Sequence, residues 1–368
     1  MTKITGTRQV IKAVIYISSA LVFFLVSIDL LVTSLSYVGN DTVRSVLEVT
    51  ANPFVSLFIG LLITALIQSS STTTSMIVAM VASGSLEMQQ AIPMIMGANI
   101  GTTITSNIVS LSYITDKPVF GRAFSSATIH DHFNILTTIV LFPLQLKYNF
   151  LELISVKVSA LLTLSSFDSG GADYLSLFRL GNLMINERFI DIVGNAVVVL
   201  ALSVVLLFAS IKLFTKIIYK LFIGSGAAKV EKLIFKNPFK SFGWGAVATA
   251  SLQSSSVTTS FIVPLVATSK IPLKRIYPFI VGANIGTTIT ALLAALFKSP
   301  EAISIAVAHV LFNLIGGVLF LLVPILNRLP LFLTNFLAGL VLRYRIISVV
   351  YIIMTFFLLP FAFIYLTK

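Results

Sequence analysis

The sequence contains one polar cassette twice. Gln-Ser-Ser-Ser occurs at Gln68–Ser71 and, 185 residues later, at Gln253–Ser256. At an equal distance downstream, each copy continues into Gly-Ala-Asn-Ile-Gly-Thr-Thr-Ile-Thr, at Gly97–Thr105 and Gly282–Thr290. Over the 38 positions from the glutamine to the last threonine, 22 are identical without a gap, and most of these are polar residues or glycine. Such a duplication inside an apolar chain is typical of membrane proteins that build a binding site near the bilayer midplane.

Composition places this cassette in a membrane. Of the 368 residues, 57% are hydrophobic and 10% are charged, whereas soluble domains carry about 25% charged residues. Stretches near the roughly 20 residues that span a bilayer occur at Val14–Tyr37, Val119–Leu144, Ala196–Leu213, Ala302–Leu326 and Ile346–Leu366. No small-residue cleavage site follows the first, which therefore predicts a membrane helix and not a signal peptide. The shorter Leu151–Leu164 and Leu331–Leu342 are predicted to lie along the interface, which leaves the side of the C-terminus open.

The net charge of +12 is distributed as in a membrane protein, not as in a nucleic-acid-binding one. Seven lysines crowd the connector 212–240, where the only acidic residue is Glu231. Under the positive-inside rule, such a cluster predicts a cytoplasmic loop. Lys3, Arg8 and Lys12 place the N-terminus on the same side. The chain has no cysteine, which excludes disulfides and thiolate metal sites.

Charge also predicts that the two copies have opposite orientations. Val14–Tyr37 carries the chain outward before the first copy, whereas the second copy follows the lysine-rich connector. The bend Thr268–Arg275 in the second copy has three basic residues. Its counterpart Ser83–Gln90 has none and carries Glu87. One bend is therefore predicted to be cytoplasmic and the other external.

Each tetrapeptide separates two apolar pieces that are too short to span alone. These pieces are Pro53–Ile67 and Thr72–Ala82, then Phe242–Leu252 and Thr258–Thr268. Because non-helical backbone at membrane depth must face protein or water, we predict an all-α polytopic membrane protein with two inverted-topology repeats, each with a re-entrant helical hairpin. Repeat 1 covers residues 1–165, an external connector 166–193, repeat 2 residues 194–345, and a last transmembrane helix 346–368.

The chemistry of the cassette favours an anion site with cations beside it. Hydroxyls and amides can donate or accept hydrogen bonds, and a helix that begins just after each tetrapeptide directs free N–H groups at the break. Neither motif contains lysine or arginine, so an anion would be held without a buried cationic side chain. Nearby carbonyl and hydroxyl oxygens suit Na⁺. The alternative is that the serines and threonines serve only close helix packing.

A second, shorter repeated motif follows each copy, and its two occurrences are 179 residues apart. It consists of three pairs: His130 and His309, Phe133 and Phe312, and Asn134 and Asn313. Asp131 has no acidic counterpart, because Val310 occupies that position. An ionisable residue within an apolar segment predicts function, here cation binding, with a structural pair to His130 or His132 as the alternative. The histidines are predicted to hydrogen-bond between helices and not to bind metal.

Taken together, these motifs resemble the type II sodium–phosphate cotransporters, and bacterial members are the closer likeness. The matching residues are Gln-Ser-Ser-Ser-x-Thr-Thr-Ser and Gly-Ala-Asn-Ile-Gly-Thr, twice, with His-Asp-x-Phe-Asn after the first copy. The resemblance implies that both tetrapeptides surround phosphate and sodium. It also implies that Asp131 belongs to the sodium site that distinguishes electrogenic from electroneutral members. A multi-pass protein of the bacterial cytoplasmic membrane is expected, with its N-terminus in the cytoplasm.

Two sets of residues are therefore predicted to form the site. Phosphate is assigned to Gln68, Ser69, Ser70, Asn99, Gln253, Ser254, Ser255 and Asn284. Sodium is assigned to Ser71, Thr102, Thr103, Asp131, Asn134, Ser256, Thr287, Thr288 and Asn313.

The predicted function is electrogenic, Na⁺-coupled uptake of inorganic phosphate by alternating access, by a monomer or a homodimer in the lipid bilayer. Transport of sulfate, arsenate or a carboxylate is the alternative, because hydroxyls and helix dipoles do not strictly discriminate among these anions. An anion channel is disfavoured, since paired hairpins from opposite faces suit alternating access better than a continuous pore. An enzyme is disfavoured because no acid–base pair, zinc-type ligand set or nucleotide loop is found.

Overall fold

The computed structural model describes residues 7–37, 50–166, 185–222, 234–235, 237–269, 271–296 and 298–367. These residues form helices and short connections without a strand, which confirms the all-α class. Most of the predicted connector 166–193 lies outside the described residues, although 185–193 is helical. The first part of the lysine-rich stretch 212–240 is also helical, because the helix that enters it continues to Phe222.

The first half of the chain comprises α1 (Thr7–Tyr37), α3 (Pro53–Ile67), α4 (Ser70–Ala82), α5 (Met88–Gly101), α6 (Ile104–Leu111), α7 (Lys117–Tyr148) and α8 (Phe150–Ser166). The second half comprises α10 (Ala196–Phe222), α12 (Pro238–Leu252), α13 (Ser255–Ser269), α14 (Leu273–Ala295), α15 (Pro300–Gly317), the π-helix η1 (Val318–Leu322) and α16 (Pro324–Arg343). The C-terminal part is α17 (Ile346–Ile353), the π-helix η2 (Met354–Leu358) and α18 (Leu359–Leu366).

Four helical stretches of the described chain are long and apolar enough to cross a membrane. They are Leu273–Ala295, Pro300–Leu322, Pro324–Arg343 and Ile346–Leu366. A fifth is possible if α7 and α8 are counted as one span, bent by 81°. The bend lies at Asn149, which has a left-handed backbone (φ 47°).

Helix boundaries near Pro324 differ from the predicted ones. The predicted span Ala302–Leu326 ends at Leu322, because Val323 adopts an extended backbone before the proline. Pro324 then begins a new helix of 20 residues. The stretch Leu331–Leu342, expected to lie along the interface, is therefore the second part of a helix long enough to span.

The helix that precedes each tetrapeptide begins in the same way. Asn52 caps α3 by accepting a hydrogen bond from Phe54 N, and Asn237 caps α12 by accepting one from Lys240 N. In both helices proline occupies the next position, where its missing N–H costs nothing. The second hairpin therefore starts at Pro238 and not at the predicted Phe242.

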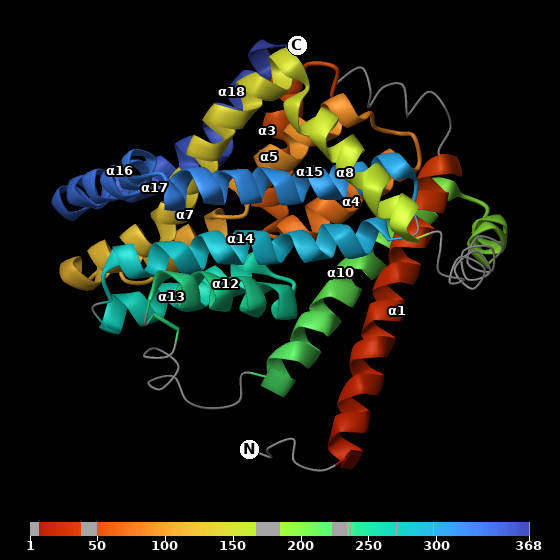
Figure 1. Cartoon of the computed structure of the whole chain (residues 1–368), viewed down its shortest axis with the longest axis horizontal. Helices are drawn as coiled ribbons and strands as arrows, with labels where there is room; N and C mark the ends of the chain where they lie inside the picture. The colour runs from red at the N-terminus through yellow and green to blue at the C-terminus, as the bar shows by residue number, and fades with distance from the viewer. Residues whose placement is uncertain are drawn as a thin grey trace.

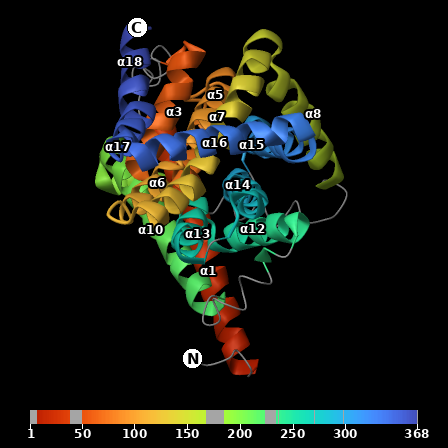
Figure 2. The same ribbon diagram turned by 90° about the vertical axis from the view of Figure 1, so that its left-hand side faces the viewer.

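The helices of the two cassettes lie close together in the centre of the molecule. In Figure 1, α3, α4 and α5 lie above α14, and α12 and α13 lie below it, while α15 runs beside α14. Figure 2 shows the same order from the side. The pair α1 and α10 extends away from this centre, and the two ends of the chain lie at opposite ends of the view.

Glycines allow the closest helix contacts within each cassette. A Cβ atom on Gly97 of α5 would lie 1.8 Å from the Leu57 carbonyl oxygen of α3. A Cβ atom on Gly282 of α14 would lie 2.0 Å from the Phe242 carbonyl oxygen of α12. Since backbone cannot move away as a side chain can, these helix pairs depend on the absence of a side chain at those positions.

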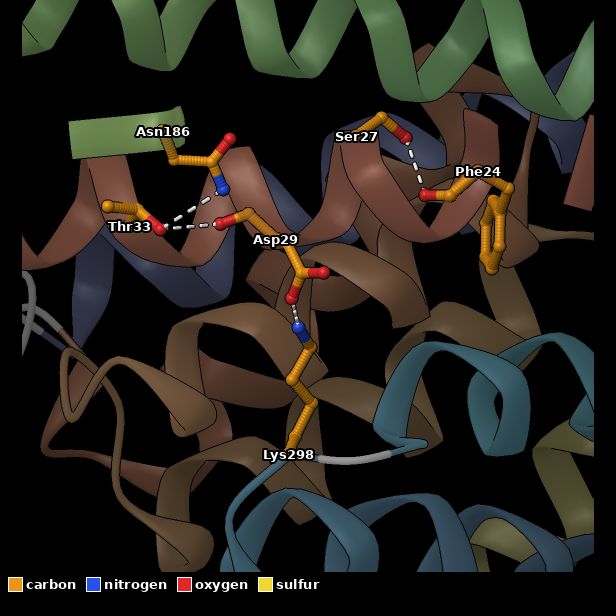
Figure 3. Close-up of polar contacts among 6 residues, drawn as sticks. All are labelled: Phe24, Ser27, Asp29, Thr33, Asn186 and Lys298. Atoms are coloured by element: carbon orange, nitrogen blue, oxygen red, sulfur yellow. Dashed lines mark hydrogen bonds and ion pairs between the residues drawn. The ribbon is translucent and has the colours of Figure 1, made fainter. Parts of the chain in front are cut away.

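A largely buried ion pair joins α1 to the centre. Asp29 of α1 pairs with Lys298 in the link between α14 and α15, and the two side chains point at each other in Figure 3. Their side chains are only 18% and 9% exposed. On the same stretch of α1, the Thr33 hydroxyl donates to the Asp29 carbonyl oxygen (2.8 Å). Removing one member of such a pair leaves an uncompensated charge away from water.

Two glycines of α12 provide a direct test of the close contact. A Cβ atom on Gly245 would lie 2.0 Å from the Phe279 carbonyl oxygen, whereas one on Gly243 would have no atom within 4 Å. Gly245→Ala is expected to destabilise the protein by roughly 1–3 kcal/mol through overpacking. Gly243→Ala is expected to stabilise it by roughly 0.5–1 kcal/mol, since alanine favours helix. Thermal unfolding of the detergent-purified variants measures both, and equal melting temperatures would contradict the contact.

Candidate functional site

Both glutamines of the tetrapeptides adopt a left-handed backbone. Gln68 has φ 57° and ends α3, and Gln253 has φ 49° and ends α12. Among the described residues other than glycine, only Asn149 shares a positive φ. A left-handed backbone is uncommon for glutamine and is maintained only where the surrounding structure imposes it. Each glutamine therefore marks a break between two helices that the sequence alone could place only approximately.

The serine that follows each glutamine begins the next helix. The Ser69 hydroxyl accepts a hydrogen bond from Thr72 N, and the Ser254 hydroxyl accepts one from Val257 N, each at 3.3 Å. Because serine is a strong helix-capping residue, α4 and α13 begin inside the tetrapeptides, at Ser70 and Ser255. The predicted starts at Thr72 and Thr258 are therefore wrong.

The two breaks contact each other. The Ser71 hydroxyl donates a 2.7 Å hydrogen bond to the main-chain carbonyl oxygen of Gln253. Nearby, the Ser255 hydroxyl is buried and has no hydrogen-bond partner among the described residues. Gln253 and Ser256 are also buried. Residues 182 positions apart in the chain are thus brought together at one polar centre.

The threonines assigned to sodium bond back to their own helices. Thr102 and Thr287 each donate to the carbonyl oxygen four residues earlier, at 3.1 Å. Thr103 and Thr288 each donate to the carbonyl oxygen three residues earlier, at 2.8 and 2.7 Å. A hydroxyl that donates a hydrogen bond keeps the lone pairs on its oxygen, and these can coordinate a cation. The helix is interrupted at Thr102 and Thr103, whereas α14 continues through Thr287 and Thr288.

The two copies are tied together by crossed hydrogen bonds, which we call the crossed braces. In one brace, His130 Nε2 donates to the Asn284 side-chain oxygen (2.5 Å), and Asn284 Nδ2 donates to Asn134 Oδ1 (2.5 Å). In the other, Asn99 Oδ1 accepts from His309 Nε2 (3.3 Å) and from Asn313 Nδ2 (3.1 Å). Each asparagine of a Gly-Ala-Asn motif is therefore held by the histidine segment that belongs to the opposite copy.

The crossed braces occupy four of the predicted site residues. Asn99 and Asn284, predicted from the sequence to bind phosphate, bond to the histidine segments through their side-chain amides. Asn134 also donates to the main-chain oxygen of Asn99 (2.6 Å). In contrast, Asn313 Oδ1 is buried without a partner. All three histidines bond to side chains of other helices, as predicted, with His132 bonded to Thr334 of α16 (2.8 Å).

Asp131 lies in a polar cluster of its own. Its carboxylate accepts hydrogen bonds from the side-chain amide of Asn107 (2.9 Å) and from the Tyr351 hydroxyl (2.9 Å). The carboxylate is fully buried, and donation from both Asn107 and Tyr351 suits its ionised form, which only accepts. Neither neighbouring histidine pairs with it, so the structural pair considered from the sequence is not the arrangement found.

This cluster has no counterpart in the second copy. Leu292 and Val310 stand at the positions equivalent to Asn107 and Asp131. In the part of the chain that the structure describes, the buried Asn107 Oδ1 has no hydrogen-bond partner. Sequence reasoning missed Asn107 and Tyr351, because neither lies in a repeated motif and Tyr351 is 220 residues away from Asp131.

Three pairs of buried hydroxyls without partners recur at the 185-residue offset. The pairs are Thr64 and Thr249, Ser75 and Ser260, and Thr105 and Thr290. Buried polar groups are normally hydrogen-bonded, and an exception calls for a reason such as a bound ion or water. Sequence reasoning missed these positions, although all six are identical between the copies. They add oxygens that could face a ligand at equivalent places in each copy.

Known proteins that are similar to this chain are transport proteins. The model of the Na⁺/Pi-cotransporter family matches residues 23–167 and 206–358. Sodium-dependent phosphate transport protein 2A of Ovis aries is 33% identical over 93% of this chain and 66% of its own length. The human protein 2B is 30% identical over 97% of this chain and 66% of its own, and the rat protein 2C is 32% identical over 75% and 59%. No solved structure matches the chain.

The fold and these matches define a multi-pass membrane protein. The chain belongs to the Na⁺/Pi-cotransporter family. It spans about two thirds of the length of the type 2A and 2B relatives that it matches.

The crossed braces lead to a stability prediction. Asn284→Ala leaves the His130 N–H and the Asn134 amide oxygen without their partner. Buried groups that lose a hydrogen bond destabilise a protein by roughly 1–3 kcal/mol, so the detergent-purified variant should melt several degrees below the wild type. Asn335→Ala, which changes an exposed asparagine of α16, is the control and should be neutral. A wild-type melting temperature for Asn284→Ala would show that the brace contributes nothing.

Proposed function

We propose that this chain is a secondary transporter that carries inorganic phosphate into the cell together with Na⁺ by alternating access. The observation that carries the proposal is the hydrogen bond from Ser71 to Gln253, which places the starts of α4 and α13 beside each other. Two helix starts supply backbone N–H groups and positive dipole ends to one anion. The relatives named as sodium-dependent phosphate transport proteins support this choice of anion and cation.

Two inverted repeats, residues 1–165 and 194–345, would form the transporter, and residues 346–368 would add its last helix. Three features recur at the 185-residue offset and support the repeat. They are the serine caps, the hydrogen bonds from threonine hydroxyls to their own helices, and the buried hydroxyls. Charge supports the inversion, since Lys274 and Arg275 of the second bend correspond to Gln89 and Gln90 of the first. With the lysine-rich connector in the cytoplasm, the N-terminus would also be cytoplasmic. The host membrane proposed is the bacterial cytoplasmic membrane.

Phosphate would be held by the tetrapeptides through Gln68, Ser69, Ser70, Gln253, Ser254 and Ser255. Ser69 and Ser254 cap their helices as acceptors, which leaves the Ser254 hydrogen for an oxyanion. The Ser69 hydroxyl also shares a 2.8 Å hydrogen bond with the Thr72 hydroxyl, in which either group can donate. The unpartnered Ser255 hydroxyl is available as a donor without breaking an existing bond. Asn99 and Asn284 would act indirectly, by fixing the helices that carry the motifs.

Sodium would bind through oxygens beside the anion, from Ser71, Ser256, Thr102, Thr103, Thr287, Thr288, Asn134 and Asn313. A further Na⁺ is proposed at Asp131. Asn107 would supply its amide oxygen there, which has no hydrogen-bond partner among the described residues. Thr103, whose hydroxyl donates to the Ile100 carbonyl oxygen, would supply the lone pairs of its oxygen. Oxygen atoms of these kinds are the ligands that hard cations prefer. Because the second copy has Leu292 and Val310 instead, this cation would be bound by the first copy alone.

Uptake into proteoliposomes tests the proposed function. Radiolabelled phosphate should accumulate only with an inward Na⁺ gradient, and excess sulfate should not compete. Phosphate uptake that does not depend on the Na⁺ gradient would refute coupling of phosphate to Na⁺. Competition by sulfate as strong as that by phosphate would assign the site to oxyanions in general. Because Na⁺ and phosphate would lie side by side, each should raise the affinity of the other by the same factor.

The same uptake assay tests where the anion binds, with the variants Ser70→Ala and Ser255→Ala. Neither serine caps a helix, so the variants leave both helix starts intact. Loss of a hydrogen bond to a charged group costs about 1.5–3 kcal/mol, or roughly ten- to a hundredfold in affinity. Ser112→Ala, at an exposed position, is the control and should transport normally. Wild-type phosphate affinity in both site variants would remove the tetrapeptides from the site.

Asp131→Asn tests the additional cation. The substitution keeps a similar shape and an oxygen that can accept from Tyr351, but it removes the charge that would neutralise Na⁺. The current per phosphate transported should fall, measured by recording current and radiolabelled uptake on the same preparation. Asp116→Asn is the matched control, because Asp116 is an exposed helix cap and asparagine caps equally well. An unchanged ratio of charge to phosphate in Asp131→Asn would defeat the assignment.

A further inference from the structure

A groove with a volume of about 630 Å³ lies outside the proposed transport site, between α12 and α14 on one side and α15, η1 and α16 on the other. Its wall is largely apolar, and several of its side chains are exposed, including Phe239 (82%), Leu322 (65%) and Val318 (47%). The volume is in the range of pockets that hold small ligands. In a membrane protein, apolar side chains exposed along such a groove face lipid.

Two cationic side chains lie in this apolar groove. Lys274 follows the first residue of α14, and Arg328 lies in the second turn of α16. Both helices are long enough to span, so residues near their starts lie near a membrane surface. No carboxylate of the described residues pairs with either side chain, and both are exposed. A lysine in a first helical turn is also disfavoured by the helix dipole, so helix stability does not account for it.

The other polar groups of the groove are already bonded. The Tyr277 hydroxyl donates to the Phe320 carbonyl oxygen (3.1 Å), and the Asn327 side-chain amide donates to the carbonyl oxygens of Phe320 and Leu321 (3.0 and 3.2 Å). These carbonyls belong to the π-helix η1. The charges that remain available to a ligand are therefore those of Lys274 and Arg328.

The equivalent face of the first copy is partly covered by aromatic side chains. There, Phe54 packs edge-on against Phe142 (5.0 Å between ring centroids), and Phe58 stacks on Phe363 of α18 (4.6 Å). The second copy has Gly243 at the position of Phe58, and a Cβ atom there would meet nothing within 4 Å. Lys274 replaces Gln89. The second copy thus has an open groove with positive charge where the first copy has aromatic packing.

We infer that this groove binds an anionic phospholipid, with an acyl chain along Val318 and Leu322 and the phosphate between Lys274 and Arg328. Basic residues near a membrane surface attract anionic headgroups, each contributing about a fivefold gain in affinity. The groove thereby complements both the acyl chain and the charged headgroup of one lipid molecule. A free phosphate ion lacks the acyl chain, and a neutral lipid lacks the net negative charge.

Binding of acyl-labelled phosphatidylglycerol to the detergent-purified full chain tests the inference. Phosphatidylglycerol should bind more tightly than phosphatidylcholine, and the acyl-free headgroup glycerophosphoglycerol should not displace it. The double variant Lys274→Gln, Arg328→Gln should weaken phosphatidylglycerol binding roughly thirtyfold. Its control, Lys157→Gln with Arg188→Gln, changes two exposed cations elsewhere and should bind as the wild type does.

A second variant tests the acyl chain separately from the charge. Val318→Phe should fill the groove and weaken binding, whereas Val205→Phe, at an exposed position of α10, should not. Equal affinity for the two lipids, or wild-type affinity in the charge variant, would overturn the proposal. Displacement by glycerophosphoglycerol would reduce the site to a headgroup site. A dimer that Val318→Phe dissociates would assign the groove to a second copy of the chain instead.

Discussion

The need to satisfy buried amide and imidazole groups organises the centre of this protein. Asn99 and Asn284 lie in α5 and α14, away from water, where an unpaired amide is costly. The side-chain oxygen of each accepts a hydrogen bond from the opposite half of the chain, from the histidine segments of α15 and α7. The close helix contacts at Gly97 and Gly282 then fix where these amides stand. The contact between the tetrapeptides lies within the framework that these bonds hold.

Much of this arrangement could be predicted from the sequence, because it is local and repeated. The helix–break–helix pattern follows from short apolar pieces on either side of Gln-Ser-Ser-Ser. The exact helix starts were missed, since the prediction did not use serine capping at Ser69 and Ser254 or the Asn-Pro pairs at Asn52 and Asn237. The last helices were misjudged where Pro324 divides a continuous apolar stretch into two.

What the sequence could not provide is the identity of long-range partners. Asp131 was expected to pair with a cation or with an adjacent histidine, and its carboxylate meets Asn107 and Tyr351. Those residues lie 24 and 220 positions away, and no repeat or spacing indicates that they meet it. The crossing of the braces between the copies is likewise a property of three-dimensional packing, since a repeated motif is equally compatible with bonds inside each copy.

The crossed braces also affect how the chain must fold. Asn134 and Asn284 are separated by 150 residues, and Asn99 and Asn313 by 214. When the first half of the chain enters the membrane during synthesis, His130 Nε2 and the Asn134 side-chain oxygen lack their partner Asn284 until α14 arrives. The first half therefore reaches its final packing only after the second half is inserted, and until then it must remain open enough to admit α14. A duplicated protein of this kind folds as a single unit, although its sequence consists of two.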